Sequence, residues 1–328
     1  MKTLKNPGMI IVAILLALYS CSLRKPPSPG YSSDSGEAEI RASLLRFSRQ
    51  YLEVKPADGF YYKMTMKEAY KWQDDFIDLL KPTLGGVIGY KAGGFDRSGN
   101  GAGPPVKMRG TFLEKMILNN GAHISSDNFV SSFIESDLLL RVGNDAINSA
   151  DTDDEILSAL DAVIPFIEFP DTMIDTTGVP GDMVAATMIM ANMVTRFGVM
   201  GNPIAIEASE DCRNRLNTFS IVMTDQDGIE LGSGSVEAKY EPLEVVRWLR
   251  DSLRDDGKVL KKGHLLSLGN LGVVVPLDNG AKAVMGGARI FTGDSVKLTY
   301  FGLDPAGPAE VTVNFDLKGT TGDLQDNK

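Results

Sequence analysis

The chain has 328 residues, 43% of them hydrophobic, and a formal net charge of −10 at pH 7. This length and apolar content suit one large or two small globular domains with a sizeable core. The acidic balance and the lack of a basic stripe exclude nucleic acid as an expected partner, because phosphate contacts need clustered lysine and arginine side chains.

The N-terminal segment has the pattern of an export signal. Lys2 and Lys5 precede an apolar stretch over residues 9–18. A helix needs about 20 apolar residues to cross a bilayer, so this stretch is too short to span one. A charged start, a short apolar run and a small residue at its exit are typical of a secretory signal peptide. An uncleaved membrane helix is disfavoured, because Arg24 and Lys25 close the run early.

The exit of the apolar run resembles the lipobox of bacterial lipoproteins, here Leu18, Tyr19, Ser20 and Cys21. The resemblance implies cleavage before Cys21 and acyl chains on that cysteine, which would then hold the protein at a lipid bilayer. Tyr19 is larger than the usual residue at its place, and a signal peptide with a chance cysteine is the alternative.

These features divide the start of the chain into a signal peptide over 1–20 and a lipidated, flexible tether over 21–36. The tether is rich in Pro, Ser and Gly, so it cannot bury enough surface to offset its ordering entropy. Ser22 follows the lipidated cysteine, and by the sorting pattern of Gram-negative lipoproteins a non-Asp residue there favours the outer membrane, on its periplasmic side. Besides Cys21 the chain contains only Cys212, so no internal disulfide is expected.

One folded unit is expected over 37–320, before a disordered tail over 321–328. Its first half contains helical patterns. Apolar residues recur at helical spacing from Ile40 to Tyr51, and a capping box of Thr65 and Glu68 precedes a second helix that Pro82 should close. Asp182 is expected to cap a short helix over 183–192.

The second half contains one clear helix, which opens at Pro242 and ends at Gly257. Strand patterns surround it. Asp227-Gly228 indicates a hairpin, and apolar residues alternate around 296–300 and 311–315. Helices early and strands late predict an α+β fold with a mainly antiparallel β core.

Acidic residues in apolar surroundings are the main chemical signal. The run 133–140 predicts a strand, whose period of two places Glu135 and Asp137 side by side on one face. Glu168 lies in a second apolar run over 163–169. Close, buried carboxylates need neutralisation, and three oxygen ligands without Cys or His favour Mg²⁺ or Mn²⁺. From the residues alone, a solvated face or pairing with arginines such as Arg141 is the alternative.

The spacing of these acids resembles the metal-binding acids of the fumarylacetoacetate hydrolase superfamily, in particular its 2-keto-4-pentenoate hydratase and 4-oxalocrotonate decarboxylase branch. The resemblance extends over about 65–320 as an ordered set of short motifs. The further landmarks are Gly89, Lys91 and Gly93; Asn192; Gly232 and Gly234; Pro242, Val246 and Trp248; and Lys262, Gly263, Gly269 and Asn270.

The resemblance implies the C-terminal-domain fold of that superfamily, a mixed β-sandwich or roll, and a homo-oligomer. It also implies metal ligation by Glu135, Asp137 and Glu168, and a catalytic role for Lys91. Contacts with substrate are implied for Asn192, Gly269 and Asn270. Three features depart from the branch: Asp137 replaces its usual Glu, His264 replaces its usual Asp, and the glycine- and proline-rich segment 99–105 matches poorly.

The activity implied is a metal-dependent hydro-lyase acting on a 2-hydroxy-2,4-dienoate or 2-oxo acid. Decarboxylation, or hydrolysis of an acylpyruvate, are the enzymatic alternatives. The hydrolase needs a water activated by a His–Glu pair, and the chain has only His123 and His264. A non-catalytic lipoprotein that binds a small acid is the alternative from another class.

Overall fold

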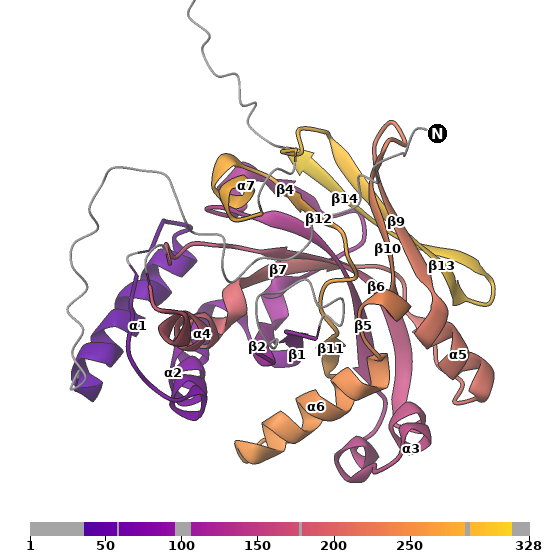
Figure 1. Cartoon of the computed structure of the whole chain (residues 1–328), viewed down its shortest axis with the longest axis horizontal. Coiled ribbons are helices and arrows are strands. Elements are labelled where there is room, and N and C mark those ends of the chain that lie inside the picture. The colour runs from indigo at the N-terminus through magenta and orange to yellow at the C-terminus, as the bar shows by residue number, and fades with distance from the viewer. Residues whose placement is uncertain (1–35, 58, 96–105, 177–178, 286–288, 317–328) are drawn as a thin grey trace, which may run out of the picture.

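The computed structural model of the chain describes residues 36–57, 59–95, 106–176, 179–285 and 289–316 (Figure 1). The predicted signal peptide, Cys21, nearly all of the tether, the segment 99–105 and the tail over 321–328 lie outside these residues. Within the described part of the chain, no helix combines the length and apolar content that a membrane crossing requires.

Three helices lie together on one side of the molecule (Figure 1): α1 (Glu37–Leu52), α2 (Met66–Leu84) and α4 (Gly181–Met190). The helical repeat predicted for α1 is confirmed, because Ile40, Leu44, Phe47 and Tyr51 are all buried. The capping box of Thr65 and Glu68 at the start of α2 is also confirmed.

Two predicted helix boundaries are wrong. Pro82 lies inside α2, which continues to Leu84 and stops only at Gly85, where φ is 89°. A proline in the last turn removes one backbone donor but leaves the earlier hydrogen bonds of the helix intact. Asp182 lies inside α4 rather than before it, because the extended backbone of Pro180 starts that helix at Gly181.

The larger sheet has nine strands in the described chain, in the order β2-β1-β11-β5-β6-β7-β3, with β12 beside β5 and β8 beside β6. Its strands are β1 (Val87–Gly93), β2 (Met108–Leu113), β3 (Ile117–Asn119), β5 (Phe133–Val142), β6 (Leu160–Pro170), β7 (Thr195–Met200), β8 (Ile204–Ala205), β11 (Leu265–Ser267) and β12 (Val274–Pro276).

The smaller sheet has the order β10-β9-β13-β14-β4. Its strands are β4 (His123–Ser125), β9 (Ser220–Asp225), β10 (Glu230–Ser235), β13 (Ser295–Asp304) and β14 (Gly307–Asp316). The hairpin predicted at Asp227-Gly228 is confirmed, since it joins β9 to β10 and Gly228 has a φ of 76°.

The remaining helices lie at the ends and edges of the sheets (Figure 1): α3 (Asp153–Ser158), α5 (Glu210–Thr218), α6 (Pro242–Asp255) and α7 (Asn279–Met285). The helix predicted from Pro242 is thus confirmed as α6. Short 3₁₀ helices occur at Glu114–Met116, Ser126–Asn128, Asp145–Ser149, Asn192–Val194 and Val236–Ala238.

The predicted α+β class is confirmed. Among the described strands only β1/β11, β3/β7 and β4/β14 pair in parallel, and the other pairs are antiparallel. The alternating apolar residues of β13 and β14 point into the core, where Val296, Leu298 and Tyr300 are completely buried. The large core cluster therefore joins the two sheets.

The Tyr300 hydroxyl links the smaller sheet to the centre of the larger one. It donates to the Asp137 carbonyl of β5 and accepts from the Phe166 amide of β6 at 3.0 Å. Both strands carry acids of the predicted site. These hydrogen bonds therefore hold the smaller sheet against the two strands that carry the site.

Replacing this hydroxyl should destabilise the fold. We expect Tyr300→Phe to lower the free energy of unfolding by about 1–3 kcal/mol, because buried backbone groups lose a partner. Urea denaturation would measure the change. Tyr62→Phe is the control, since its hydroxyl bonds to the Ser43 hydroxyl at 2.9 Å at a partly exposed position. Equal losses in the two variants would contradict the role assigned to Tyr300.

Candidate metal centre

The predicted acids lie on two neighbouring central strands. Glu135 of β5 faces Glu168 of β6 directly across the antiparallel pair, and Asp137 follows two residues later on β5. Side chains two apart on a strand share a face, so all three acids project to the same side of the sheet. Their carboxylates interact electrostatically with one another. The solvated-face alternative is wrong, because Asp137 and Glu168 are buried.

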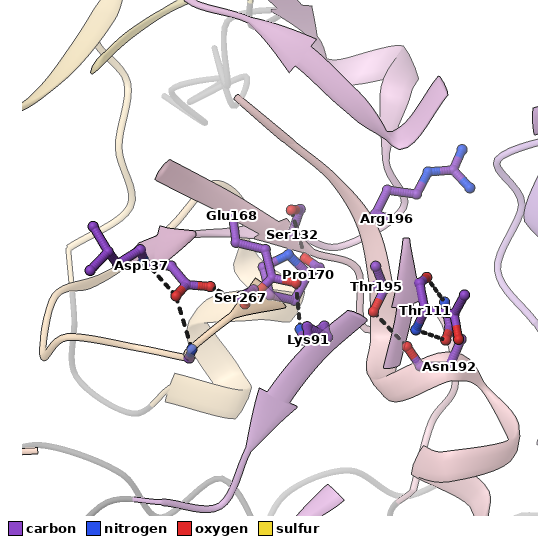
Figure 2. Close-up of polar contacts among 12 residues, drawn as sticks. Lys91, Thr111, Ser132, Asp137, Glu168, Pro170, Asn192, Thr195, Arg196 and Ser267 are labelled. Carbon is purple, nitrogen blue, oxygen red and sulfur yellow. Dashed lines mark hydrogen bonds and ion pairs between the residues drawn. The ribbon is translucent and has the colours of Figure 1, made fainter. Parts of the chain in front are cut away.

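Lys91 reaches the same cluster from β1. Its ammonium forms an ion pair with Glu168 Oε1, and the two side chains are only 5% and 1% exposed (Figure 2). Lys91 lies beside Gly110 of β2 and Ser267 of β11. A Cβ atom at Gly110 would lie 2.9 Å from Lys91 Cγ, so this glycine leaves room for the lysine stem. The role of Gly110 beside Lys91 was not predicted from the sequence.

The cluster holds more negative than positive charge. Burial, followed by the Glu168 carboxylate, raises the pKa of Glu135 to about 8, against the opposing effect of Lys91. The same two causes raise the pKa of Asp137 to about 7, although a hydrogen bond from Ser267 opposes them. Burial lowers the pKa of Lys91, but Glu168 and Glu135 more than offset it and the net shift is upward. A bound cation would relieve this repulsion.

The second oxygen of Glu168 offers a direct test of whether a cation fits. Glu168 Oε2 is buried and has no hydrogen-bond partner among the described residues. A buried carboxylate oxygen without a partner is costly, and a hard cation such as Mg²⁺ would satisfy it. The donor set therefore suits such an ion. The described residues nevertheless contain no group of three or more His, Cys, Asp or Glu side chains arranged to hold a metal.

The Asp137 carboxylate is hydrogen-bonded to groups of the protein through both of its oxygens. Its Oδ1 accepts from the Leu138 amide at 2.6 Å and from the Gly269 amide at 2.9 Å, and its Oδ2 accepts from the Ser267 hydroxyl. Figure 2 shows Asp137 turned to Ser267 while Glu168 turns to Lys91. The sequence did not identify Ser267, a single hydroxyl in an apolar strand.

Gly269 and Asn270 follow Ser267 and lie beside the acids, since the Gly269 amide donates to Asp137 at 2.9 Å. Asn270 Nδ2 donates to the Val273 carbonyl at 3.1 Å, and Asn270 Oδ1 accepts from the Gly272 amide. A hydrogen bond between the Asn270 side chain and Glu135 opposes the rise in the pKa of Glu135. Asn270 thus contacts the acid cluster, and its contact with a substrate stays a prediction.

Asn192 has a different environment. Its side-chain oxygen accepts from the Thr111 amide at 2.6 Å, and its side-chain nitrogen donates to the Thr111 carbonyl at 2.9 Å. The amide therefore holds the turn after α4 against β2 (Figure 2). The predicted contact of Asn192 with substrate stays a prediction.

Both histidines of the chain lie away from the acid cluster. His123 begins β4 at the edge of the smaller sheet and is exposed. His264 packs edge-on against Tyr90, with ring centroids 5.5 Å apart, and its Nδ1 accepts from the Lys261 amide at 3.2 Å. A His–Glu pair that activates water is therefore absent from the described acid cluster.

No family model matches the sequence, and a search of curated proteins found no match. Solved structures do match. A structure of 4-oxalocrotonate decarboxylase from Pseudomonas putida G7, complexed with magnesium and adipate, has a TM-score of 0.66 at 17% identity, and the match covers 85% of this chain and 98% of that one. The same enzyme complexed with calcium and acetate gives 0.64 at 17% identity, with the same coverage.

A more distant match has a TM-score of 0.50 at 9% identity, to a probable 2-hydroxyhepta-2,4-diene-1,7-dioate isomerase from Mycobacterium abscessus. It covers 70% of this chain and 75% of that one. These likenesses confirm the expected fold: the chain has the fold of the fumarylacetoacetate hydrolase superfamily.

The acid cluster should make the metal-free protein less stable as the pH rises. The pKa of Glu135 in the folded chain, about 8, exceeds its ordinary value of 4.5. The folded state thus holds this proton more tightly, and the resulting stability is complete below pH 4.5 and lost as the pH rises through about 8. In EDTA, Glu135→Gln should raise the free energy of unfolding at about pH 8.5 by roughly 1 kcal/mol or more.

The same variant should gain little near pH 4.5, because Glu135 is then protonated in the folded state and already half protonated in the unfolded state. Glu230→Gln, at an exposed position on β10, is the matched control and should show no such pH dependence. A gain for Glu135→Gln that is equal at both pH values would contradict the account in which ionisation of Glu135, buried and beside Glu168, destabilises the fold.

Proposed function

We propose that this chain is a divalent-metal-dependent lyase acting on a small 2-oxo acid or its dienol. Hydration of a 2-hydroxy-2,4-dienoate is the leading reaction. The observation that carries the proposal is the buried Lys91–Glu168 pair, whose Glu168 Oε2 lacks a partner within an excess of negative charge. Likeness of fold to an enzyme complexed with magnesium and adipate supports a cation and a small carboxylic acid as ligands.

Mg²⁺ or Mn²⁺ would be held by Glu168 and by Glu135, which faces it across β5 and β6. The sequence predicts Asp137 as the third ligand, but the oxygens of its carboxylate already accept three hydrogen bonds within the protein. When bound, such a cation supplies Lewis-acid stabilisation of the negative charge that develops on the 2-oxygen as the enolate forms.

Lys91 would act as a fixed positive charge. Because its pKa is raised, it stays protonated at neutral pH and is a poor general base. One of its three N–H donors is used by Glu168. The others can donate to the carboxylate or enolate oxygens of the substrate, where a positioned donor lowers the barrier.

In the hydration reaction, the dienol first becomes a conjugated 2-oxo acid. Water then adds across the C3–C4 double bond, with the hydroxyl on C4 and the proton on C3, and gives a 4-hydroxy-2-oxo acid. The bonds made and broken balance without any oxidant or reductant. The residues of the chain would bind the acid, orient it and stabilise the enolate.

Decarboxylation is the second candidate, and the likeness to 4-oxalocrotonate decarboxylase favours it. Loss of CO₂ from a related acid passes through the same enolate, so the same residues could serve it. The acylpyruvate hydrolase alternative is disfavoured, because both histidines lie outside the acid cluster.

Activity on a panel of 2-oxo and dienol acids tests the proposal. Dienoate absorbance should fall in the presence of Mg²⁺ or Mn²⁺, and EDTA should stop the loss. Release of CO₂ would identify decarboxylation instead. Lys91→Met should lower kcat/KM by about 100-fold or more, because an electrostatic donor to the developing charge is lost. It should not weaken cation binding, since it removes a competing positive charge.

Lys297→Ala is the control, because Lys297 is exposed on β13 in the smaller sheet. Circular dichroism would confirm that Lys91→Met is folded. Cation binding with no turnover of any acid in the panel would favour the non-catalytic binder over the lyase.

We also propose that the protein is exported and anchored through acyl chains on Cys21, at the periplasmic side of the outer membrane. Support comes from the lipobox-like sequence ahead of Cys21 and from Ser22 after it. In this arrangement the tether would let the folded unit act beside the membrane.

Replacing the acylated cysteine tests the anchor. Cys21→Ala should abolish incorporation of labelled fatty acid and leave the protein uncleaved or freely soluble, whereas Cys212→Ala should still be acylated. The anchor assignment is wrong if Cys21→Ala still incorporates the label and fractionates with the membrane.

A further inference from the structure

Asp137 is held differently from the other two acids. It is completely buried, and its oxygens accept three hydrogen bonds, from Leu138, Ser267 and Gly269. The bond from Leu138 comes from its own strand, and the other two come from the segment 267–269. The Asp137 carboxylate is thus already satisfied within the protein.

Glu168 and Glu135 are not held in this way. Glu168 has one oxygen on Lys91 and one without a partner. Glu135 faces Glu168 across the strand pair and is only partly buried. The two glutamates therefore have the open oxygen positions that a cation needs, and Asp137 does not.

The segment that Asp137 holds is a tight turn with little freedom. Gly269 has a φ of 94°, which other residues rarely adopt, and its carbonyl accepts from the Tyr240 hydroxyl at 2.8 Å. A Cβ atom at Gly269 would lie 3.0 Å from the Ala92 carbonyl oxygen of β1. The turn is therefore fixed from three sides: by Asp137, by Tyr240 and by β1.

The next residue in the turn is Asn270, whose side chain bonds within the same loop, to the Val273 carbonyl and the Gly272 amide. Asn270 lies near enough to Glu135 to oppose the rise in the pKa of that acid. Because Asn270 is covalently joined to Gly269, a residue that holds the Gly269 amide also limits where Asn270 can lie relative to Glu135.

We propose that Asp137 is a positioning residue: it anchors the turn 267–270, which carries Asn270, and leaves the cation to Glu135 and Glu168. Asp137 has a shorter side chain than the glutamate usual in the branch, and this length explains why it can act as an anchor. It keeps the carboxylate near its own backbone, within reach of the Leu138 amide, whereas a glutamate would carry the carboxylate one methylene further. The cation part rests on the proposed function; the anchoring part does not.

Charge-matched amide variants separate a ligand from an anchor. Asp137→Asn and Glu135→Gln each remove one negative charge from the cluster and keep the side-chain shape. The asparagine can still accept from the Leu138 and Gly269 amides. Mn²⁺ affinity, measured by titration calorimetry, should fall less than about tenfold for Asp137→Asn. It should fall by more than about 100-fold for Glu135→Gln and Glu168→Gln, because losing a ligand exceeds the cost of losing an outer partner.

Hydrogen exchange of the Gly269 amide tests the anchor without any metal. Exchange in EDTA should accelerate by about tenfold or more in Asp137→Ala, since a buried, charge-assisted hydrogen bond is lost. It should remain slow in Asp137→Asn, and in the control Glu168→Gln, which has no bond to the turn.

A loss of Mn²⁺ affinity in Asp137→Asn as large as in Glu135→Gln would overturn the proposal, because Asp137 would then be a ligand. Unchanged Gly269 exchange in Asp137→Ala would overturn the anchoring role. If the unmodified protein binds no Mn²⁺, the proposed function fails, and the anchor still stands or falls on the exchange result.

Discussion

The ion pair between Lys91 and Glu168 is the constraint on which the rest of the site depends. Each side chain lies in an apolar interior, and removing one partner of such a pair typically costs about 3–5 kcal/mol. The pair nevertheless leaves one Glu168 oxygen unsatisfied and two further acids beside it. Ionisable side chains thus lie in an apolar interior, where they are costly to bury. Such groups cluster at functional sites.

The sheet order explains how the charges meet. β1 and β5 do not pair with each other; β11 lies between them. This short strand pairs in parallel with β1, so Ser267 lies beside Lys91, and its antiparallel pairing with β5 brings the Ser267 hydroxyl to Asp137. The backbones of β1 and β11 can lie this close because Gly89 has no side chain. A Cβ atom at Gly89 would lie 2.1 Å from the Leu265 carbonyl oxygen.

Much of the fold was predictable because its signals are local. The alternation in β5 placed Glu135 and Asp137 on one face, and the apolar repeat of α1 identified its buried side. The end of α2 and the start of α4 were misplaced, since Pro82 and Asp182 gave local signals that packing and neighbouring turns overrode.

The partners within the site were less accessible from the sequence. Ser267 and Gly110 become significant only through pairings between distant strands, which no local pattern encodes. The same holds for Asp137: its residue type and spacing suggested a ligand, but its bonds to Leu138, Ser267 and Gly269 come from tertiary structure.

The central place of β11 also affects how the chain must fold as it is made. Synthesis proceeds from the N-terminus, so β1 and β5 leave the ribosome long before residues 265–267. Until then each strand has an unpaired edge flanked by apolar residues, and such edges are templates for aggregation. A chain truncated before β11 would therefore keep both edges unpaired, and it would lack the strand that joins β1, with Lys91, to the acids of β5 and β6.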